Sequence, residues 1–391
     1  MHSPDFFIGD TAAAFREMRR TTPVVWNSEM KFWSLLRYED CRHVSSNPRL
    51  FTSTKGVTIP DPAFPEAPVH EGSLLFTDPP RHRQLRKLIN AGFTKRQVTL
   101  LEAKVRGLVT DIVSEIDPSR EYEFADELAA PLPTRIIAEM LGAPPEDWEQ
   151  FRTWSDAFVG SADPEIQLDT LAAAGELYAY FTELIEARRA GKVTDSDDLL
   201  SILAAAEVDG ERLSDDDLLN FSFLLLVAGN ETTRNLIALG TLALIENPDQ
   251  FALLLDRPDL LPSAVEEMLR FTSPVTHMAR TANEDTVIRG QQIKAGEIIV
   301  MLYGSANRDE AVFGETAESF DITRSPNPHI AFGAGEHSCL GAQLARLEAR
   351  IMFEVLLGTY PTIELTGDVT RLRATMVPGV KSMPVRLGAG V

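Results

Sequence analysis

The stretch that decides the fold is Phe332-Gly333-Ala334-Gly335-Glu336-His337-Ser338-Cys339-Leu340-Gly341. It leads from a glycine-rich loop into an apolar helical pattern, which continues with Leu344, Leu347 and Ile351. Because Cys339 stands where the helix begins, we expect its thiol to lie among free N–H groups at the positive end of a helix dipole, which favours the thiolate. Gly333 and Gly335 permit positive φ and a close approach of the backbone to a flat ligand.

Several interpretations of Cys339 compete. The chain has only one other cysteine, Cys41, whereas a structural zinc site needs about four clustered ligands. A disulfide between the two cysteines lacks the support of a signal peptide and an oxidising compartment. A lone cysteine is usually a small buried hydrophobic residue, and His337, two residues away, makes a Cys–His nucleophile the sharper rival. The surrounding glycines instead favour a rigid thiolate that is the axial ligand of haem iron.

Size and charge restrict the class of protein. The chain has 391 residues and a formal net charge of −21, so it repels nucleic acid and anionic membranes. Its most apolar run, 221–228, is far shorter than the ~20 residues of a membrane span, and the first five residues show no signal pattern. We therefore expect a cytoplasmic protein. Length alone suggests two or three domains, but no change of composition marks a linker, so we expect a single domain over residues 1–391.

A basic island at 81–87 stands out in this acidic chain, and Lys95 and Arg96 follow it. Such a run is usually a solvated helix face. In an acidic protein it is also suited to dock an acidic partner or to bind anionic groups of a ligand.

Periodicity predicts a helix-rich fold. A short strand is expected to end at 34–38, before a helix. Further helices are expected at 81–92, 97–115, 133–142, 145–160, 166–190, 197–206 and 258–270. Residues 55–75 contain four prolines and predict a long loop of the kind that forms lids and binding loops. Residues 275–302 predict a small sheet, and the tail from Ile363 has a similar strand-and-turn pattern.

The longest helix is expected from Ser214 to about Glu246. Ser214 is a good N-cap, three aspartates fill the first turn, and Pro248 ends the segment. At 1.5 Å per residue this helix is roughly 50 Å long, enough to cross the whole molecule.

The middle of this helix, 228–233, breaks the rules of helix formation. Gly229 costs about 1 kcal/mol relative to alanine, and Thr232 and Thr233 can bond back to the preceding turn. Glu231 places a carboxylate after an apolar stretch. A distorted core helix explains this pattern, and so does an acid–alcohol pair that faces a bound oxygen molecule, because local rule-breaking is typical of functional sites.

The cysteine stretch resembles the haem-binding signature of cytochrome P450, with the bacterial-type His337 where many members have arginine. The run Ala-Gly-x-Glu-Thr-Thr resembles the oxygen-activation motif of the same family. The resemblance implies that Glu231 and Thr232 deliver protons and that Ala228 leaves room for oxygen and substrate over the haem. The segments 306–309 and 327–329 also look familial.

Glu267 and Arg270 match the Glu-x-x-Arg pair of the family, which is buried and closed by an arginine from a later loop. Arg324 is the expected third member, although Ile322 stands where many members have proline. Because removal of one partner of a buried pair costs about 3–5 kcal/mol, we expect Glu267→Ala to give little haem-loaded protein.

The resemblance also implies a set of cofactor contacts. Haem propionates need cationic partners in a protein interior. The family positions that hold them are His82, Arg86, Arg280 and His337 in this chain. Ala228, Phe332 and Gly341 are the further expected contacts of haem b, whose axial ligand is Cys339.

The implied fold is the mostly α cytochrome P450 fold with a small β-rich lobe. The implied activity is reductive activation of O₂, in which one oxygen atom enters a C–H or C=C bond of a hydrophobic substrate and the other leaves as water. A steroid, a terpenoid or a fatty acyl compound is the expected substrate. It would lie in a pocket formed by Val227, Ala228, Val275 and Met278. We expect a monomer that receives electrons from a ferredoxin and its reductase.

Three other functions remain open at this stage. A peroxygenase would use peroxide directly, a haem-based ligand sensor would not turn over, and a Cys339 hydrolase would be colourless.

Overall fold

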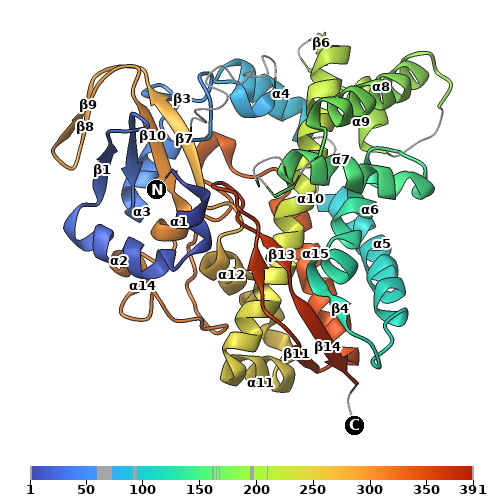
Figure 1. Cartoon of the computed structure of the whole chain (residues 1–391). Coiled ribbons are helices and arrows are strands. Elements are labelled where there is room, and N and C mark those ends of the chain that lie inside the picture. Colours follow the sequence, from blue (N-terminus) through green and yellow to red (C-terminus); the bar gives the residue numbers. More distant parts are fainter. Residues whose placement is uncertain are drawn as a thin grey trace.

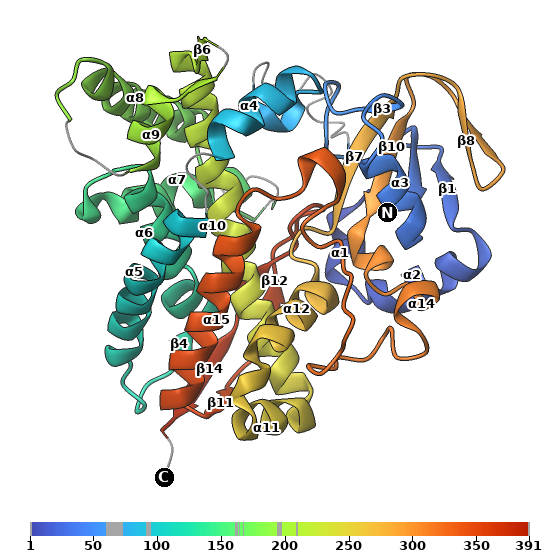
Figure 2. The same cartoon turned by 180° about the vertical axis from the view of Figure 1, so that it is seen from behind.

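The computed structural model describes residues 2–59, 73–90, 95–160, 163, 165–166, 168–193, 198–208 and 210–389. Most of the loop predicted at 55–75 lies outside the described residues. In Figure 1 a helix-rich body lies beside a β-rich lobe that contains the N-terminus, and Figure 2 shows the same two regions from behind. The predicted fold class, mostly α with a small β-rich lobe, is confirmed.

The longest helix, α10 (Asp215–Glu246), crosses the middle of the molecule between the two regions (Figure 1). Its start is fixed by a capping box, in which Asp217 N donates to Ser214 Oγ at 3.0 Å and Ser214 N donates to Asp217 Oδ2 at 3.0 Å. The segment 235–244 is buried on every side, as expected for a helix inside a large core. The predicted bounds of this helix agree with the structure.

The other long helices surround α10 and were largely predicted, with shifts of a few residues at their ends. They are α4 (Arg81–Ile89), α5 (Lys95–Ser114), α6 (Pro131–Met140), α7 (Trp148–Gly160), α8 (Thr170–Arg189), α9 (Leu199–Ala205), α12 (Leu261–Thr272) and α15 (Ala342–Thr359). The pattern did not identify α1 (Pro4–Ile8), α2 (Thr11–Thr21), α11 (Pro248–Asp256), α13 (Tyr303–Ala306) or α14 (Glu310–Phe313). The helix expected after the first strand is α3 (Tyr38–Ser45).

Irregular helical segments connect these elements. The π-helix η3 (Phe124–Ala129) precedes α6, and the short 3₁₀ helices are η1 (Leu74–Phe76), η4 (Pro145–Asp147), η5 (Pro258–Leu260) and η6 (Gly335–His337).

The β-rich lobe is built around a five-stranded sheet in the order β1-β2-β10-β7-β3. Its strands are β1 (Val24–Asn27), β2 (Phe32–Leu35), β3 (Phe51–Thr52), β7 (His277–Ala282) and β10 (Ile298–Leu302). Strands β2 and β10 are parallel and the other pairs are antiparallel. The predicted sheet at 275–302 is therefore joined by N-terminal strands, of which the sequence indicated only the one at 34–38.

The C-terminal strands form smaller sheets against the helical body. The order β11-β14-β4 joins β11 (Thr362–Leu365), β14 (Pro384–Gly388) and β4 (Tyr122–Glu123). Two-stranded pairs are made by β12 (Thr370–Arg371) with β13 (Val380–Ser382), by β8 (Thr286–Ile288) with β9 (Gln291–Ile293), and by β5 (Glu207–Val208) with β6 (Glu211–Arg212). Within the described part of the chain, no helix has the length and apolarity needed to cross a membrane.

Candidate active site

A cavity lies where α10, α15, α4 and β7 meet the loop that contains Cys339. Of the two cysteines, Cys339 lines this cavity and is exposed in it, whereas Cys41 is fully buried in the β-rich lobe, with its Sγ 3.4 Å from Leu35 O. The N–H of Cys339 donates to Phe332 O at 2.8 Å. This bond closes the glycine-rich loop and places the thiol three residues before the first residue of α15.

The electrostatics of Cys339 differ from the expectation. The surrounding walls shield the thiol from bulk water, which raises its pKa. The N–H of Gly341 and the charges of Arg86 and Arg346 lower the pKa but do not cancel this effect. The helix start therefore acts on the thiol in the predicted direction, but among the protein groups taken by themselves burial outweighs it. A cation bound to the sulfur, such as a metal ion, would reverse the balance.

The two loop glycines have the backbone conformations that the sequence predicts, with φ +72° at Gly333 and +71° at Gly335. At Gly335 a Cβ atom would lie 2.7 Å from Ser45 O. This glycine is therefore required by close packing against the end of α3. Gly341 has open space where a Cβ would stand.

A cluster of basic side chains lines one side of the cavity. His82 and Arg86 come from α4, Arg280 from β7 and His337 from η6. The rings of His82 and His337 have centroids 4.1 Å apart. Burial lowers the pKa of His82 and brings that of His337 to about 3, with nearby arginines acting in the same direction.

Within the described part of the chain, these basic groups are only partly satisfied. His82 is 1% exposed, its Nδ1 lies 3.9 Å from Glu336 Oε2, and neither of its ring nitrogens has a hydrogen-bond partner among the described residues. Arg280 is 3% exposed and donates through Nη1 to Ala279 O at 2.7 Å. Buried polar groups are normally satisfied, so this side of the cavity fits a ligand that carries carboxylates.

Tyr303 and Ser45 also line the cationic side of the cavity. They were not predicted, because Tyr303 opens a short helix after β10 and Ser45 ends α3, and neither position has a local signal. The bulk of the basic island is neutralised: Arg81 Nη2 lies 3.1 Å from Asp217 Oδ2, and Arg83 Nε lies 3.0 Å from Glu336 Oε1.

The two members of the predicted acid–alcohol pair, Glu231 and Thr232, point in different directions from α10. Thr232 lines the cavity, and its Oγ1 donates to Ala228 O at 2.7 Å. Glu231 is 3% exposed and is absent from the cavity wall. Its Oε2 lies 2.9 Å from Arg234 Nη1, and its Oε1 accepts from Asn235 Nδ2 at 3.0 Å. Because neighbouring residues of a helix point about 100° apart, the two side chains face different surroundings.

Burial raises the pKa of Glu231, and the charge of Arg234 only partly offsets this effect. The expectation that Glu231 faces a bound oxygen molecule is thus not met in this conformation of the side chain.

The remaining wall of the cavity is apolar. Of the predicted pocket residues, Ala228, Val275 and Met278 line it and Val227 does not. The α10 residues that take the place of Val227 are Phe221, Leu224 and Leu225. The prediction missed them because an apolar helix gives no sequence signal for which of its faces meets a cavity.

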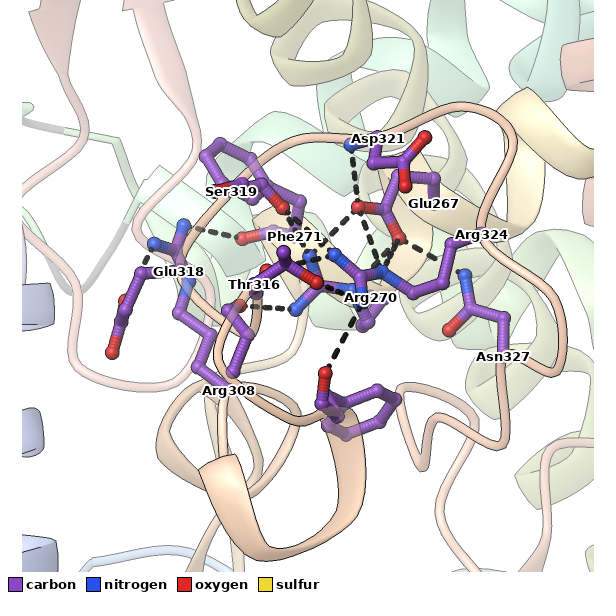
Figure 3. Close-up of polar contacts among 12 residues, drawn as sticks. Glu267, Arg270, Phe271, Arg308, Thr316, Glu318, Ser319, Asp321, Arg324 and Asn327 are labelled. Carbon is purple, nitrogen blue, oxygen red and sulfur yellow. Dashed lines mark hydrogen bonds and ion pairs between the residues drawn. The ribbon is translucent and has the colours of Figure 1, made fainter.

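A buried ion-pair network joins α12 to the loop before the cysteine stretch (Figure 3). Glu267 and Arg270 are both 0% exposed, and Arg270 Nη2 lies 2.7 Å from Glu267 Oε1. Arg324 Nε lies 3.1 Å from Glu267 Oε2, and Asn327 Nδ2 donates to the same oxygen at 3.0 Å. Sequence reasoning named the first three residues but not Asn327, or Asp321, whose N–H donates to Glu267 at 2.8 Å.

Comparison with known proteins identifies the family of this chain. Residues 254–372 match the family model described as Cytochrome P450. The chain is 39% identical over 389 residues to a methyl-branched lipid omega-hydroxylase of Mycobacterium bovis, covering 95% of this chain and 90% of the relative. It is 40% identical over 380 residues to a steroid C26-monooxygenase of Mycobacterium tuberculosis, covering 96% and 93%. A linalool 8-monooxygenase of Pseudomonas putida is 37% identical over 392 residues, covering 95% and 94%.

Solved structures agree with the sequence comparison. Substrate-free CYP109E1 from Bacillus megaterium superposes with a TM-score of 0.89 at 35% identity, covering 97% of this chain and 99% of that chain. The molecule is therefore a haem-thiolate monooxygenase in fold and class. The chain belongs to the cytochrome P450 family.

The residues present fit the haem of this family. The cavity has a cysteine that opens into it, buried basic side chains suited to the two propionates, and a largely apolar wall opposite. When bound, a haem thiolate supplies the reductive activation of O₂.

Proposed function

We propose that Cys339 is the axial thiolate ligand and that His82, Arg86, Arg280 and His337 hold the haem propionates. The ring nitrogens of His82 support this assignment most directly, because no described residue forms a hydrogen bond with them and buried polar groups are normally satisfied. Ala228, Phe332 and Gly341 border the same space. We take residues 1–391 as one haem-thiolate domain that acts as a monomer.

Thr232 is the group that handles the proton at the oxygen side of the site. Its Oγ1–H is held by Ala228 O in a back-bond, so it must rotate away from this acceptor to donate into the cavity. Glu231 can pass a proton to Thr232 only if its carboxylate breaks the ion pair with Arg234. The apolar residues of α10 and β7 exclude water from the cavity and hold the substrate against the part of the wall that contains Thr232.

The substrate is a hydrophobic molecule with a branched aliphatic chain, oxidised at the end of that chain. Omega, C26 and carbon 8, the positions in the names of the three relatives, each denote a chain-end carbon. The apolar wall of Leu225, Val275 and Met278 matches an alkyl chain end. The alkyl tail of the substrate therefore enters the cavity first, and a bulky or polar head remains farther from the apolar wall.

Electrons come from a ferredoxin and its reductase. Ferredoxins are acidic, and residues 81–106 contain eight lysines and arginines but only one acidic residue, Glu102. Four of these basic residues, Arg81, Arg83, Lys104 and Arg106, pair with acidic side chains of this chain. The support for such a partner is the local excess of basic residues in a chain of net charge −21.

An optical titration of the purified ferric protein tests the assignment. Linalool, a sterol with an intact side chain and a linear fatty acid are added separately. We expect a low-to-high-spin shift of the haem band with the branched ligands and a weaker shift with the linear one. Product analysis then locates the new hydroxyl group. Oxidation of a ring carbon instead of the chain end would refute the proposed orientation, and a spectrum without haem would refute the cofactor site.

A further inference from the structure

A second cavity, of about 300 Å³, lies apart from the loop that contains Cys339. Its walls come from α1, the start of α2, the C-terminal end of α10, the end of α12 and the segment that follows α12. Neither Cys339 nor any of the basic side chains that we assign to the haem propionates lines it. Since small-molecule sites begin at about this volume, the second cavity has room for a small organic ligand outside the candidate active site.

One part of this second cavity is apolar. Phe7 of α1 and Phe15 of α2 line it from the N-terminal side of the chain. Leu239 and Leu242 line it from α10, and Phe271 lines it from the end of α12. These side chains fit the alkyl chain or aromatic ring of a ligand, because removal of apolar surface from water is favourable.

The other part of the cavity contains two arginines. Arg308 is already engaged, because its Nη1 lies 3.2 Å from Glu318 Oε2 and its Nη2 donates to Phe271 O at 2.9 Å. Arg371 of β12 has neither a hydrogen bond nor an ion pair within the described part of the chain. Because an arginine stays protonated in proteins, Arg371 has a charged guanidinium whose N–H donors are available to a ligand.

Glu246, the last residue of α10, is the one acidic side chain among the described residues that line this cavity. Burial lowers the pKa of Arg371, and the charge of Glu246 opposes this effect only in part. The two side chains do not form an ion pair, and Glu246 is exposed, so water can solvate its carboxylate. A ligand that binds Arg371 therefore displaces no existing partner.

We propose that the second cavity is a binding site for a small amphipathic carboxylate. The carboxylate binds the guanidinium of Arg371, whose planar fork can donate to both carboxylate oxygens, and the alkyl or aryl part lies among the phenylalanines and leucines. Pro274 lines both cavities, whereas Val275 lines only the first and Thr276 only the second. The proposed ligand therefore lies next to the segment that forms part of the candidate substrate wall.

The test is isothermal titration calorimetry of the haem-loaded protein saturated with phenylimidazole. This haem ligand fills the active-site cavity, so the heat released by a further ligand reports binding elsewhere. Octanoate is the probe, and octanol and octylammonium are its matched neutral and cationic analogues. We expect one octanoate to bind per chain, more tightly than either analogue.

Two variants and a control locate the bound probe. Arg371→Gln should weaken octanoate binding about 10- to 100-fold, as the loss of hydrogen bonds to a charged group implies, and should leave octanol binding unchanged. Ala12 lines the cavity from α2, so Ala12→Phe should fill the cavity and prevent the binding of both probes. Arg257→Gln, which removes an exposed arginine paired with Asp259, is the matched control and should bind octanoate as the wild type does.

Three results would overturn the proposal. They are no binding of octanoate to the saturated wild-type protein, equal binding of octanoate to the wild type and Arg371→Gln, and tighter binding of octylammonium than of octanoate. The comparison of the three probes in the wild type decides the question even if a variant fails to fold. The haem band reports the proposed function separately: if phenylimidazole shifts this band but octanoate does not bind, the second site is refuted and the cofactor site stands.

Discussion

Replacement of Glu267 by alanine tests whether the buried ion-pair network of Figure 3 supports the haem site. Glu267 accepts hydrogen bonds from Arg270, Arg324, Asn327 and the backbone of Asp321. Its loss leaves the guanidinium of Arg270, which is 0% exposed, without a counter-charge.

The magnitude follows from this burial. An uncompensated buried charge costs about 3–5 kcal/mol, which is a large part of the roughly 5–15 kcal/mol that stabilises a typical protein. Arg270 keeps three carbonyl acceptors, Asn307 O, Ala317 O and Ser319 O, at 2.9, 2.7 and 2.8 Å. These acceptors satisfy its N–H groups but not its charge. We therefore expect a loss of about 3–5 kcal/mol, equivalent to a few-hundredfold to few-thousandfold change in the unfolding equilibrium.

The assay is urea unfolding of the haem-loaded protein, followed by both the haem band and far-ultraviolet circular dichroism. Haem content per chain is measured after expression. Asp259→Ala is the control, because it removes the exposed partner of Arg257 at a similar distance of 2.7 Å and should change neither signal. A loss below about 1 kcal/mol in Glu267→Ala, with normal haem content, would refute the reasoning.

Three further outcomes are expected. His82→Phe keeps an aromatic ring but removes two nitrogens that have no hydrogen-bond partner among the described residues. Haem should therefore transfer to apomyoglobin roughly 10- to 100-fold faster, as the loss of a hydrogen bond to a charged group implies. Gly335→Ala places a Cβ 2.7 Å from a carbonyl oxygen at the end of α3 and strains a φ of +71°, which should lower haem content; normal loading would contradict this. The pKa of Glu266 is about 2: burial raises it, but hydrogen bonds and charges of Arg346 and His329 outweigh burial. The pKa of Glu266 in the folded protein thus lies below the usual 4.5. The ionised carboxylate therefore contributes its full stabilisation of the fold above that pH, and this contribution is lost on acidification toward pH 2. Glu266→Gln should accordingly reduce the dependence of the unfolding free energy on pH in this window.

Elements with a strong local signal were predictable. The start of α10 follows from Ser214 and the aspartates after it, because a capping box is a contact among neighbours in sequence. The Glu267–Arg270 pair is similarly local. By contrast, α1 and α2 and the strand β1 are short and are stabilised by contacts with distant residues, such as Arg19 with Glu318. Periodicity within one segment does not report such contacts.

The candidate site shows the same limit at the level of single side chains. The sequence named the residues that reach the cavity from four elements, but it did not determine the orientation of residues on α10. Glu231 and Val227 do not line the cavity, and Glu231 pairs with Arg234, which is itself bonded to Ala125 O, Asp126 and Val380 O outside α10. Glu348, which lines the cavity from α15, had no signal at all, since an isolated glutamate in an amphipathic helix usually lies on its solvated face.

The distribution of charge in the cavity also bears on how a substrate enters. All of the cations that line the described wall lie on the side of α4, β7 and η6, where the proposed propionate sites are. The lining that α10 and α15 contribute is mainly alkyl and aromatic, and its polar groups are the hydroxyls of Thr232 and Thr233 and the carboxyl group of Glu348. A ligand carboxylate pushed toward this wall would lose its hydration without gaining a partner, whereas an alkyl end gains about 25 cal/mol for each Å² removed from water. The arrangement of charged and apolar walls that we propose for the cofactor therefore also supports the proposal that oxidation occurs at the chain end rather than near a polar head.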